Sequence, residues 1–115
     1  MQSEPMKIEA TPEFKRSVRT LSKRYRHIRA DIQPVIDRLQ EGKVVGDKIS
    51  GTSYAVFKVR VKNTDIQRGK SGGYRFIYYL KTSSHIILVA FYSKSDQGDI
   101  SAATINKIVS KFESS

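Results

Sequence analysis

The chain has no cysteine and only two histidines among its 115 residues. Without cysteine it forms no disulfide, no thiolate metal site and no thiol nucleophile. His27 and His85 are isolated from each other, and we expect structural roles for both. We therefore expect no metal and no cofactor. The lack of cysteine also fits a cytoplasmic location, which we expect here.

Long apolar runs are missing too. The longest one without a charge, Ile86 to Tyr92, is far shorter than the roughly 20 residues of a membrane helix. Residues 1–9 lack the basic and apolar regions of a signal peptide. We expect no membrane partner and no secretion. The length suits one domain, so we expect a single domain over residues 1–115, with residues 1–5 as a disordered leader.

Acidic residues are scarce relative to basic ones. The chain has 21 Lys and Arg against 11 Asp and Glu, a formal net charge of +10. Such an excess destabilises a compact state by self-repulsion, and it attracts polyanions. Nucleic acid, an anionic membrane or an acidic protein would each satisfy it, and the shortness of the apolar runs disfavours the membrane.

Helical periodicity dominates the first part of the chain. Thr11 and Pro12 are typical of a helix N-cap and first helical position. Four apolar residues then recur at helical spacing, namely Phe14, Val18, Leu21 and Tyr25. A second helix is predicted from about Ile28 to Glu41. Pro34 either kinks that helix or opens a separate final turn, and the sequence leaves both open.

Strand patterns surround and follow these helices. Residues 6–10 alternate weakly, and residues 54–62 alternate cleanly between apolar and basic side chains. Residues 74–80 and 85–92 predict a central hairpin, and residues 100–112 predict a last helix capped by Asp99 or Ser101. The order β-α-α-β-β-β-α indicates the α+β class, with helices on one face of a small, largely antiparallel sheet.

Cations gather in the segment from residue 58 to residue 81, which holds only one acid, Asp65. These cations are Lys58, Arg60, Lys62, Arg68, Lys70, Arg75 and Lys81. Like charges on one strand face cost stability, so we favour a polyanion-binding surface over a merely solvated one. The glycine-rich loop of residues 69–73 is either a phosphate cradle or a flexible hairpin loop.

A second basic stretch, Lys15 to Arg29, contains seven cations and no acid. We interpret it as a long basic helix that contacts a polyanion, and we expect Arg19, Lys23 and Arg26 to make these contacts.

The scattered acids argue against a paired-carboxylate active site. RNA cleavage by the substrate's own 2′-hydroxyl remains feasible. It requires cations that stabilise the pentacoordinate phosphorane and lower the pKa of that hydroxyl, plus one weak acid or base.

The segments FKVRVKN, RGKSGGYRFIYYL and ILVAFYSKSDQGDI resemble the RelE superfamily of toxins, and most closely its HigB-like branch. The resemblance spans nearly the whole chain. It implies ribosome-dependent, metal-independent endonucleolytic cleavage of mRNA, inhibition of protein synthesis, and neutralisation by a cognate antitoxin. The residues that match the family's catalytic cations are Lys58, Arg60, Arg75 and Lys94. The residues expected to bind RNA around them are Lys62, Arg68, Lys70 and Tyr92. Arg19, Lys23 and Arg26 of the basic stretch are expected to contact ribosomal RNA.

Two positions depart from the RelE pattern. Ser95 stands where RelE has an arginine, and no tyrosine follows Tyr92. Arg68, Lys70 and Tyr92 are the candidates to substitute. Two alternatives therefore stay open: an RNA- or ribosome-binding module without catalysis, and a toxin resembling the ParE branch, which inhibits DNA gyrase by binding.

Overall fold

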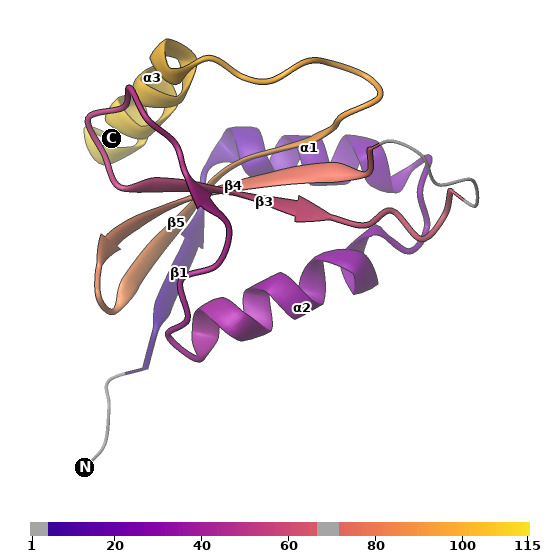
Figure 1. Ribbon diagram of the computed structural model, residues 1–115, viewed down its shortest axis with the longest axis horizontal. Helices are drawn as coiled ribbons and strands as arrows, with labels where there is room; N and C mark the ends of the chain where they lie inside the picture. The colour runs from indigo at the N-terminus through magenta and orange to yellow at the C-terminus, as the bar shows by residue number, and fades with distance from the viewer. Residues whose placement is uncertain (1–4, 67–71) are drawn as a thin grey trace.

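The computed structural model describes residues 5–66 and 72–115, which form three helices and a five-stranded sheet (Figure 1). The elements are β1 (Lys7–Ala10), α1 (Pro12–Ser22), α2 (Ile28–Gln40), β2 (Asp47–Lys48), β3 (Val56–Val61), β4 (Tyr74–Thr82), β5 (His85–Ser93) and α3 (Ala102–Glu113). This confirms the predicted α+β class and adds the short β2. The predicted leader falls almost entirely outside the described residues.

The start of α1 follows directly from its first residues. The Thr11 hydroxyl accepts a hydrogen bond from the backbone N–H of Phe14 at 3.0 Å, and Pro12 occupies the first turn, where its missing N–H costs nothing. The same hydroxyl donates to the carbonyl oxygen of Val89 at 2.8 Å. One threonine thus caps α1 and fastens it to β5.

Helix α2 continues through Pro34 as one helix, so this proline does not open a separate final turn. None of the helices in the described residues is long and apolar enough to cross a membrane.

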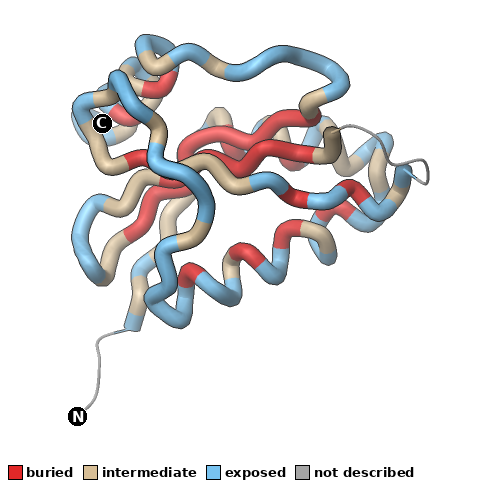
Figure 2. The backbone as a smooth tube through the Cα atoms, viewed as in Figure 1, coloured by how far each residue is buried: buried red, intermediate tan, exposed pale blue. Residues whose placement is uncertain are grey.

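The sheet has the strand order β1-β5-β4-β3-β2. Strand β1 runs parallel to β5, and the other neighbours are antiparallel. The hairpin of β4 and β5 lies at the centre, as its near-continuous hydrophobicity predicts. Buried residues concentrate in these two strands (Figure 2).

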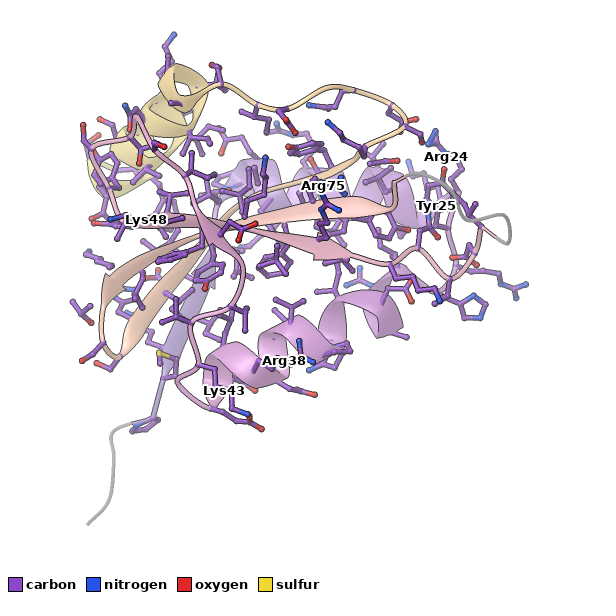
Figure 3. The ribbon with its side chains drawn as sticks, viewed as in Figure 1. Arg24, Tyr25, Arg38, Lys43, Lys48 and Arg75 are labelled. Atoms are coloured by element: carbon purple, nitrogen blue, oxygen red, sulfur yellow. The ribbon has the colours of Figure 1, made fainter. Side chains whose placement is uncertain are left out.

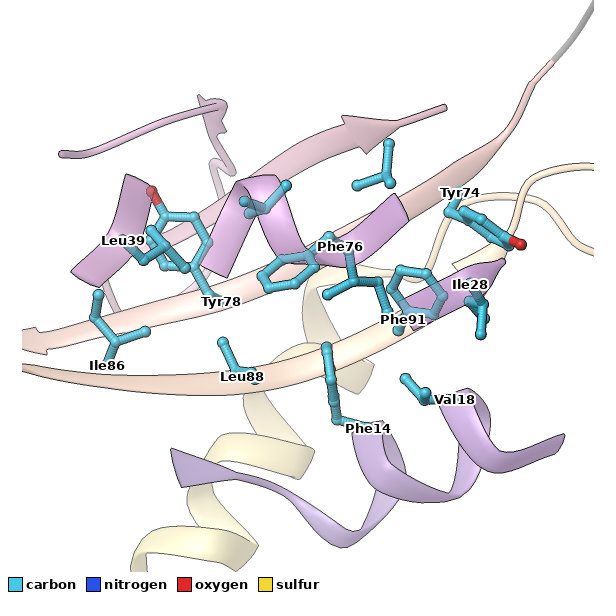
Figure 4. Packing of buried hydrophobic residues seen from close by; sticks show 13 residues of the cluster. Phe14, Val18, Ile28, Leu39, Tyr74, Phe76, Tyr78, Ile86, Leu88 and Phe91 are labelled. Carbon is cyan, nitrogen blue, oxygen red and sulfur yellow. The ribbon is translucent and has the colours of Figure 1, made fainter. Parts of the chain in front are cut away.

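The helices cover both faces of the sheet, so the expectation that all lie on one face is wrong. On one face, Phe14 of α1 and Leu39 of α2 pack with Phe76 and Tyr78 (Figure 4). On the other face, α3 packs on residues that alternate with these, and that second cluster includes Val56, Ile77, Ile87, Val89, Ile105 and Val109. Because β4 and β5 are apolar on both sides, they need a cover on each.

Helix α3 covers only part of its face. Val56, at the start of β3, is fully buried beneath this layer, whereas Arg60 on the same face is exposed. The sheet therefore presents an uncovered basic area beside α3, at the end of β3 and the beginning of β4.

Candidate functional site

A hollow of about 460 Å³ opens on the uncovered part of the sheet. Its lining residues are Gly46, Asp47, Lys58, Arg60, Arg75, Lys94 and Asp99. The fold thus brings together all four cations predicted to be catalytic. They come from β3, β4 and the residue that follows β5, which are separated along the chain but adjacent in the sheet.

Strand register explains how these side chains meet. Arg60 pairs with Arg75 across β3 and β4, and Arg75 pairs with Tyr92 across β4 and β5. Paired residues project from the same face, so these three form a row across the sheet. Lys58 precedes Arg60 by two residues and projects from that face about 7 Å away.

Arg75 is almost completely buried, with 8% of its surface exposed. Its Nη1 donates to the carbonyl oxygens of Gly72 at 2.8 Å and Tyr74 at 3.1 Å. The nearby Asp96 pairs with Arg24 at 2.7 Å and not with Arg75. Figure 3 shows Arg75 over the sheet and Arg24 near one end of it. Backbone carbonyls therefore orient the guanidinium without neutralising its charge.

Asp99 is the central anion of the hollow. Its Oδ1 accepts hydrogen bonds from Lys94 Nζ at 3.1 Å and from the Tyr92 hydroxyl at 3.2 Å, and lies 3.6 Å from Lys58 Nζ. The hydrogen bond from Lys94 and the nearby charge of Lys58 hold the pKa of Asp99 below its ordinary value. Burial, reinforced by the charge of Asp99, raises the pKa of Tyr92.

Sequence reasoning did not find this role for Asp99, which was considered only as a helix cap. The cap of α3 is Ser101, whose hydroxyl accepts from the backbone N–H of Thr104 at 3.1 Å. The one available signal was the position of Asp99, an acid five residues after Lys94 in a chain poor in acids.

Lys62 lies just beyond β3 and lines a neighbouring hollow of about 380 Å³ rather than the first one. The two hollows share Arg60. The predicted RNA-binding residues Arg68 and Lys70 lie outside the described residues.

The N-terminal end of α2 holds the loop that follows β3. Asp31 accepts from the backbone N–H of Thr64 at 3.0 Å and from its hydroxyl at 2.8 Å. Asp65 accepts from the backbone N–H of His27 at 2.9 Å and contacts the His27 ring at 2.7 Å. His85 pairs with Glu9. Both histidines thus bind carboxylates outside the first hollow, and no group of three metal-binding side chains occurs in residues 5–66 and 72–115.

The prediction that the basic stretch from Lys15 to Arg29 forms one long helix is wrong. Helix α1 ends at Ser22 and α2 begins at Ile28. Arg19 lies on α1, whereas Lys23 and Arg26 lie in the connection. All seven cations of the stretch are nevertheless exposed, and they are Lys15, Arg16, Arg19, Lys23, Arg24, Arg26 and Arg29.

The first hollow is suited to bind a phosphodiester. Arginine presents a planar fork for two phosphate oxygens, lysine contributes a point charge, and the neutral Tyr92 hydroxyl donates a hydrogen bond. A family model described as RelE toxin of the RelE/RelB toxin–antitoxin system matches residues 6–112. A comparison with curated proteins found no match.

Proposed function

The chain belongs to the RelE toxin family of toxin–antitoxin systems, and on that premise we propose that it is an endoribonuclease that cleaves mRNA on the ribosome. The family implies a cognate antitoxin as its partner. We further propose that the protein acts in the cytoplasm and lies in the HigB-like branch of the superfamily.

The observation that supports this proposal is the meeting of Lys58, Arg60, Arg75 and Lys94 in one hollow. Four cations around one cavity favour a substrate with several negative charges close together. Cleavage by the 2′-hydroxyl of RNA concentrates further negative charge on the phosphoryl oxygens, so the same cations stabilise the transition state more than the ground state.

In this mechanism the 2′-oxygen attacks the neighbouring phosphorus and the bond from phosphorus to the 5′-oxygen breaks. The 2′-hydroxyl gives up its proton, and the departing 5′-oxygen takes one up. Arg75 and Arg60 bind the phosphoryl oxygens, and Lys58 and Lys94 add positive charge. Tyr92 is protonated at neutral pH, as an ordinary tyrosine is, and burial together with the charge of Asp99 raises its pKa further, so its hydroxyl is suited to donate a hydrogen bond to an oxygen of the substrate.

The ribosome supplies what this hollow lacks, namely alignment of the scissile phosphate with the 2′-hydroxyl. The exposed cations Arg19, Lys23 and Arg26 are proposed to contact ribosomal RNA, and Lys62, Arg68 and Lys70 to contact mRNA beside the hollow.

Mapping of mRNA ends after addition of the pure protein to a translating ribosome mixture tests this proposal. New internal ends should appear in translated mRNA and not in the same mRNA without ribosomes. The double variant Lys58→Gln, Arg75→Gln should produce none. The matched variant Arg38→Gln, Lys107→Gln removes two exposed cations from α2 and α3 and should cleave normally. Efficient digestion of naked RNA, or no new ends with the wild type, would contradict the proposal.

A ribosome-binding module without catalysis is the second candidate. It is favoured by Ser95, which is exposed and contacts the Ser93 hydroxyl rather than supplying a cation to the hollow. Ribosome binding without new mRNA ends would identify this function. Inhibition of DNA gyrase with intact mRNA would instead indicate a ParE-like toxin.

A further inference from the structure

Three donors from separate parts of the sheet converge on one oxygen of Asp99. Lys58 comes from β3, Tyr92 from β5, and Lys94 from the connection after β5. All three lie between 3.1 and 3.6 Å from Asp99 Oδ1. Two ammonium groups and a hydroxyl around one oxygen form an arrangement that also suits a nonbridging phosphate oxygen.

We propose that Lys58, Tyr92 and Lys94 form a second phosphate subsite beside Arg60 and Arg75, and that Asp99 occupies this subsite in the free protein until RNA displaces it. The inference deepens the proposed function and rests on it, because it assigns a second backbone contact to the same RNA.

The division into two subsites follows from the partners of each cation. In the described part of the chain, Asp99 pairs with both lysines, whereas the nearby Asp96 pairs with Arg24. The guanidinium of Arg75 is bound by backbone carbonyls that carry no net charge. Both lysines of the hollow are therefore paired with a carboxylate, whereas within the described residues neither Arg60 nor Arg75 forms an ion pair.

The position of Asp99 allows RNA to displace its carboxylate from the two lysines. Its side chain is 54% exposed, so solvent screens its ion pairs and weakens them. It belongs to no helix or strand, and Gly98 precedes it. Lys94 is fixed by a hydrogen bond from its backbone N–H to the Gly73 carbonyl at 2.9 Å, and Ser101 is fixed as the α3 cap. On either side of Asp99, Asp96 is bound to Arg24 and Ile100 packs against the second core cluster, so displacement of Asp99 requires only a rotation of its own side chain.

A catalytic base is a less suitable role for Asp99. The two lysines that bind it stabilise its charged form, which lowers its affinity for a proton. A general base near neutral pH requires the opposite shift. A carboxylate with these neighbours is a good counter-ion and a poor proton acceptor.

Binding of a 2′-O-methyl oligoribonucleotide, which lacks the attacking hydroxyl, tests the subsite without cleavage. Asp99→Asn should bind this oligonucleotide up to about fivefold more tightly than the wild type, because no carboxylate competes for the lysines. The matched control is Asp47→Asn, since Asp47 lines the same hollow and its loss changes the net charge equally. Fluorescence anisotropy at fixed ionic strength measures the three dissociation constants.

The gain in affinity for the oligonucleotide must be larger for Asp99→Asn than for Asp47→Asn. Equal tightening of the two variants would reduce the effect to net charge and overturn the inference. Weaker binding by Asp99→Asn would also overturn it, because Asp99 would then hold the lysines in place for RNA. Absence of binding in all three proteins would show that these cations form no phosphate site.

A double-mutant cycle adds a second test. Lys94→Gln should weaken oligonucleotide binding more in the Asp99→Asn background than in the wild type, because Asp99 no longer masks the lysine. Additive effects would overturn the inference. The mapping of mRNA ends is independent of both measurements, so cleavage by the wild type with an additive cycle would leave the proposed function standing and remove only the second subsite.

Discussion

Arg60 and Arg75 face each other directly across β3 and β4, so two residues of like charge form a cross-strand pair. Such pairs destabilise a sheet, and the near-complete burial of Arg75 increases the cost. The carboxylates of Asp96 and Asp99 form ion pairs with Arg24 and Lys94 and not with these two arginines. An anionic ligand between the two arginines would relieve this repulsion.

Replacing Arg60 should therefore stabilise the protein while impairing cleavage. Arg60→Thr removes the repulsion and introduces a residue that favours strands, so we expect the free energy of unfolding to rise by about 0.5 kcal/mol. Urea unfolding measures this change. Lys62→Thr is the control, because it removes a cation just beyond β3. An equal gain in both variants would attribute the effect to net charge alone.

Substitution of Arg75 should separate cleavage from folding. Arg75→Lys keeps the charge but loses the planar fork, and Arg75→Ala loses both. We expect cleavage rates to fall on the order of 10²-fold or more, as for removal of a preorganised transition-state contact. Arg75→Ala should remain folded, bind ribosomes and be non-toxic when expressed without an antitoxin.

The decisive comparison for Arg75 is melting temperature against cleavage rate. Arg75 has no ion pair to lose within the described residues, only hydrogen bonds to two carbonyls. A sharp fall in melting temperature, with toxicity reduced only in proportion, would instead make Arg75 a structural residue.

The basic surface of α1 and its following connection should contribute to ribosome binding. Replacing Arg19, Lys23 and Arg26 with Gln should weaken binding and flatten its dependence on salt, because fewer counterions are released. The measurement is the slope of log affinity against log salt concentration. A control triple variant at three other exposed cations, Arg38, Lys43 and Lys107, should keep the wild-type slope. An unchanged slope in the first variant would leave its residues as ordinary surface charge.

Acid should weaken the contact between Asp65 and His27. Hydrogen bonds from the His27 ring and backbone hold the pKa of Asp65 below its ordinary value. A carboxyl group whose pKa is lowered by folding stabilises the folded state at pH values above its ordinary pKa of about 3.9. This contribution is lost as the pH falls through the lowered pKa. Wild type should therefore be more stable than Asp65→Asn at about pH 5.5, and the difference should shrink toward about pH 2.5.

Urea unfolding across this pH range checks the Asp65 prediction. His27→Ala keeps the backbone hydrogen bond to Asp65 and should lose only part of the pH dependence. Identical pH dependence in wild type and Asp65→Asn would show that the contact contributes no stability.

The sequence by itself determined the elements and their class. Thr11 and Pro12 start α1 because their capping chemistry is local, and the apolar alternation of β3 and the continuous hydrophobicity of β4 and β5 follow from strand periodicity. The two-residue β2 escaped prediction because it is too short to show a period. The resemblance also identified Lys58, Arg60, Arg75 and Lys94, which the fold does bring together.

Only the tertiary structure decided what these residues face. The helical period shows that α3 has an apolar side but not which face of the sheet receives it, since β4 and β5 are apolar on both. The strand register places Arg60 opposite Arg75, and the tertiary fold brings Asp96 into an ion pair with the distant Arg24. Asp99 meets Lys58 because the chain returns over the sheet after β5, a contact between residues 41 positions apart that no local pattern encodes.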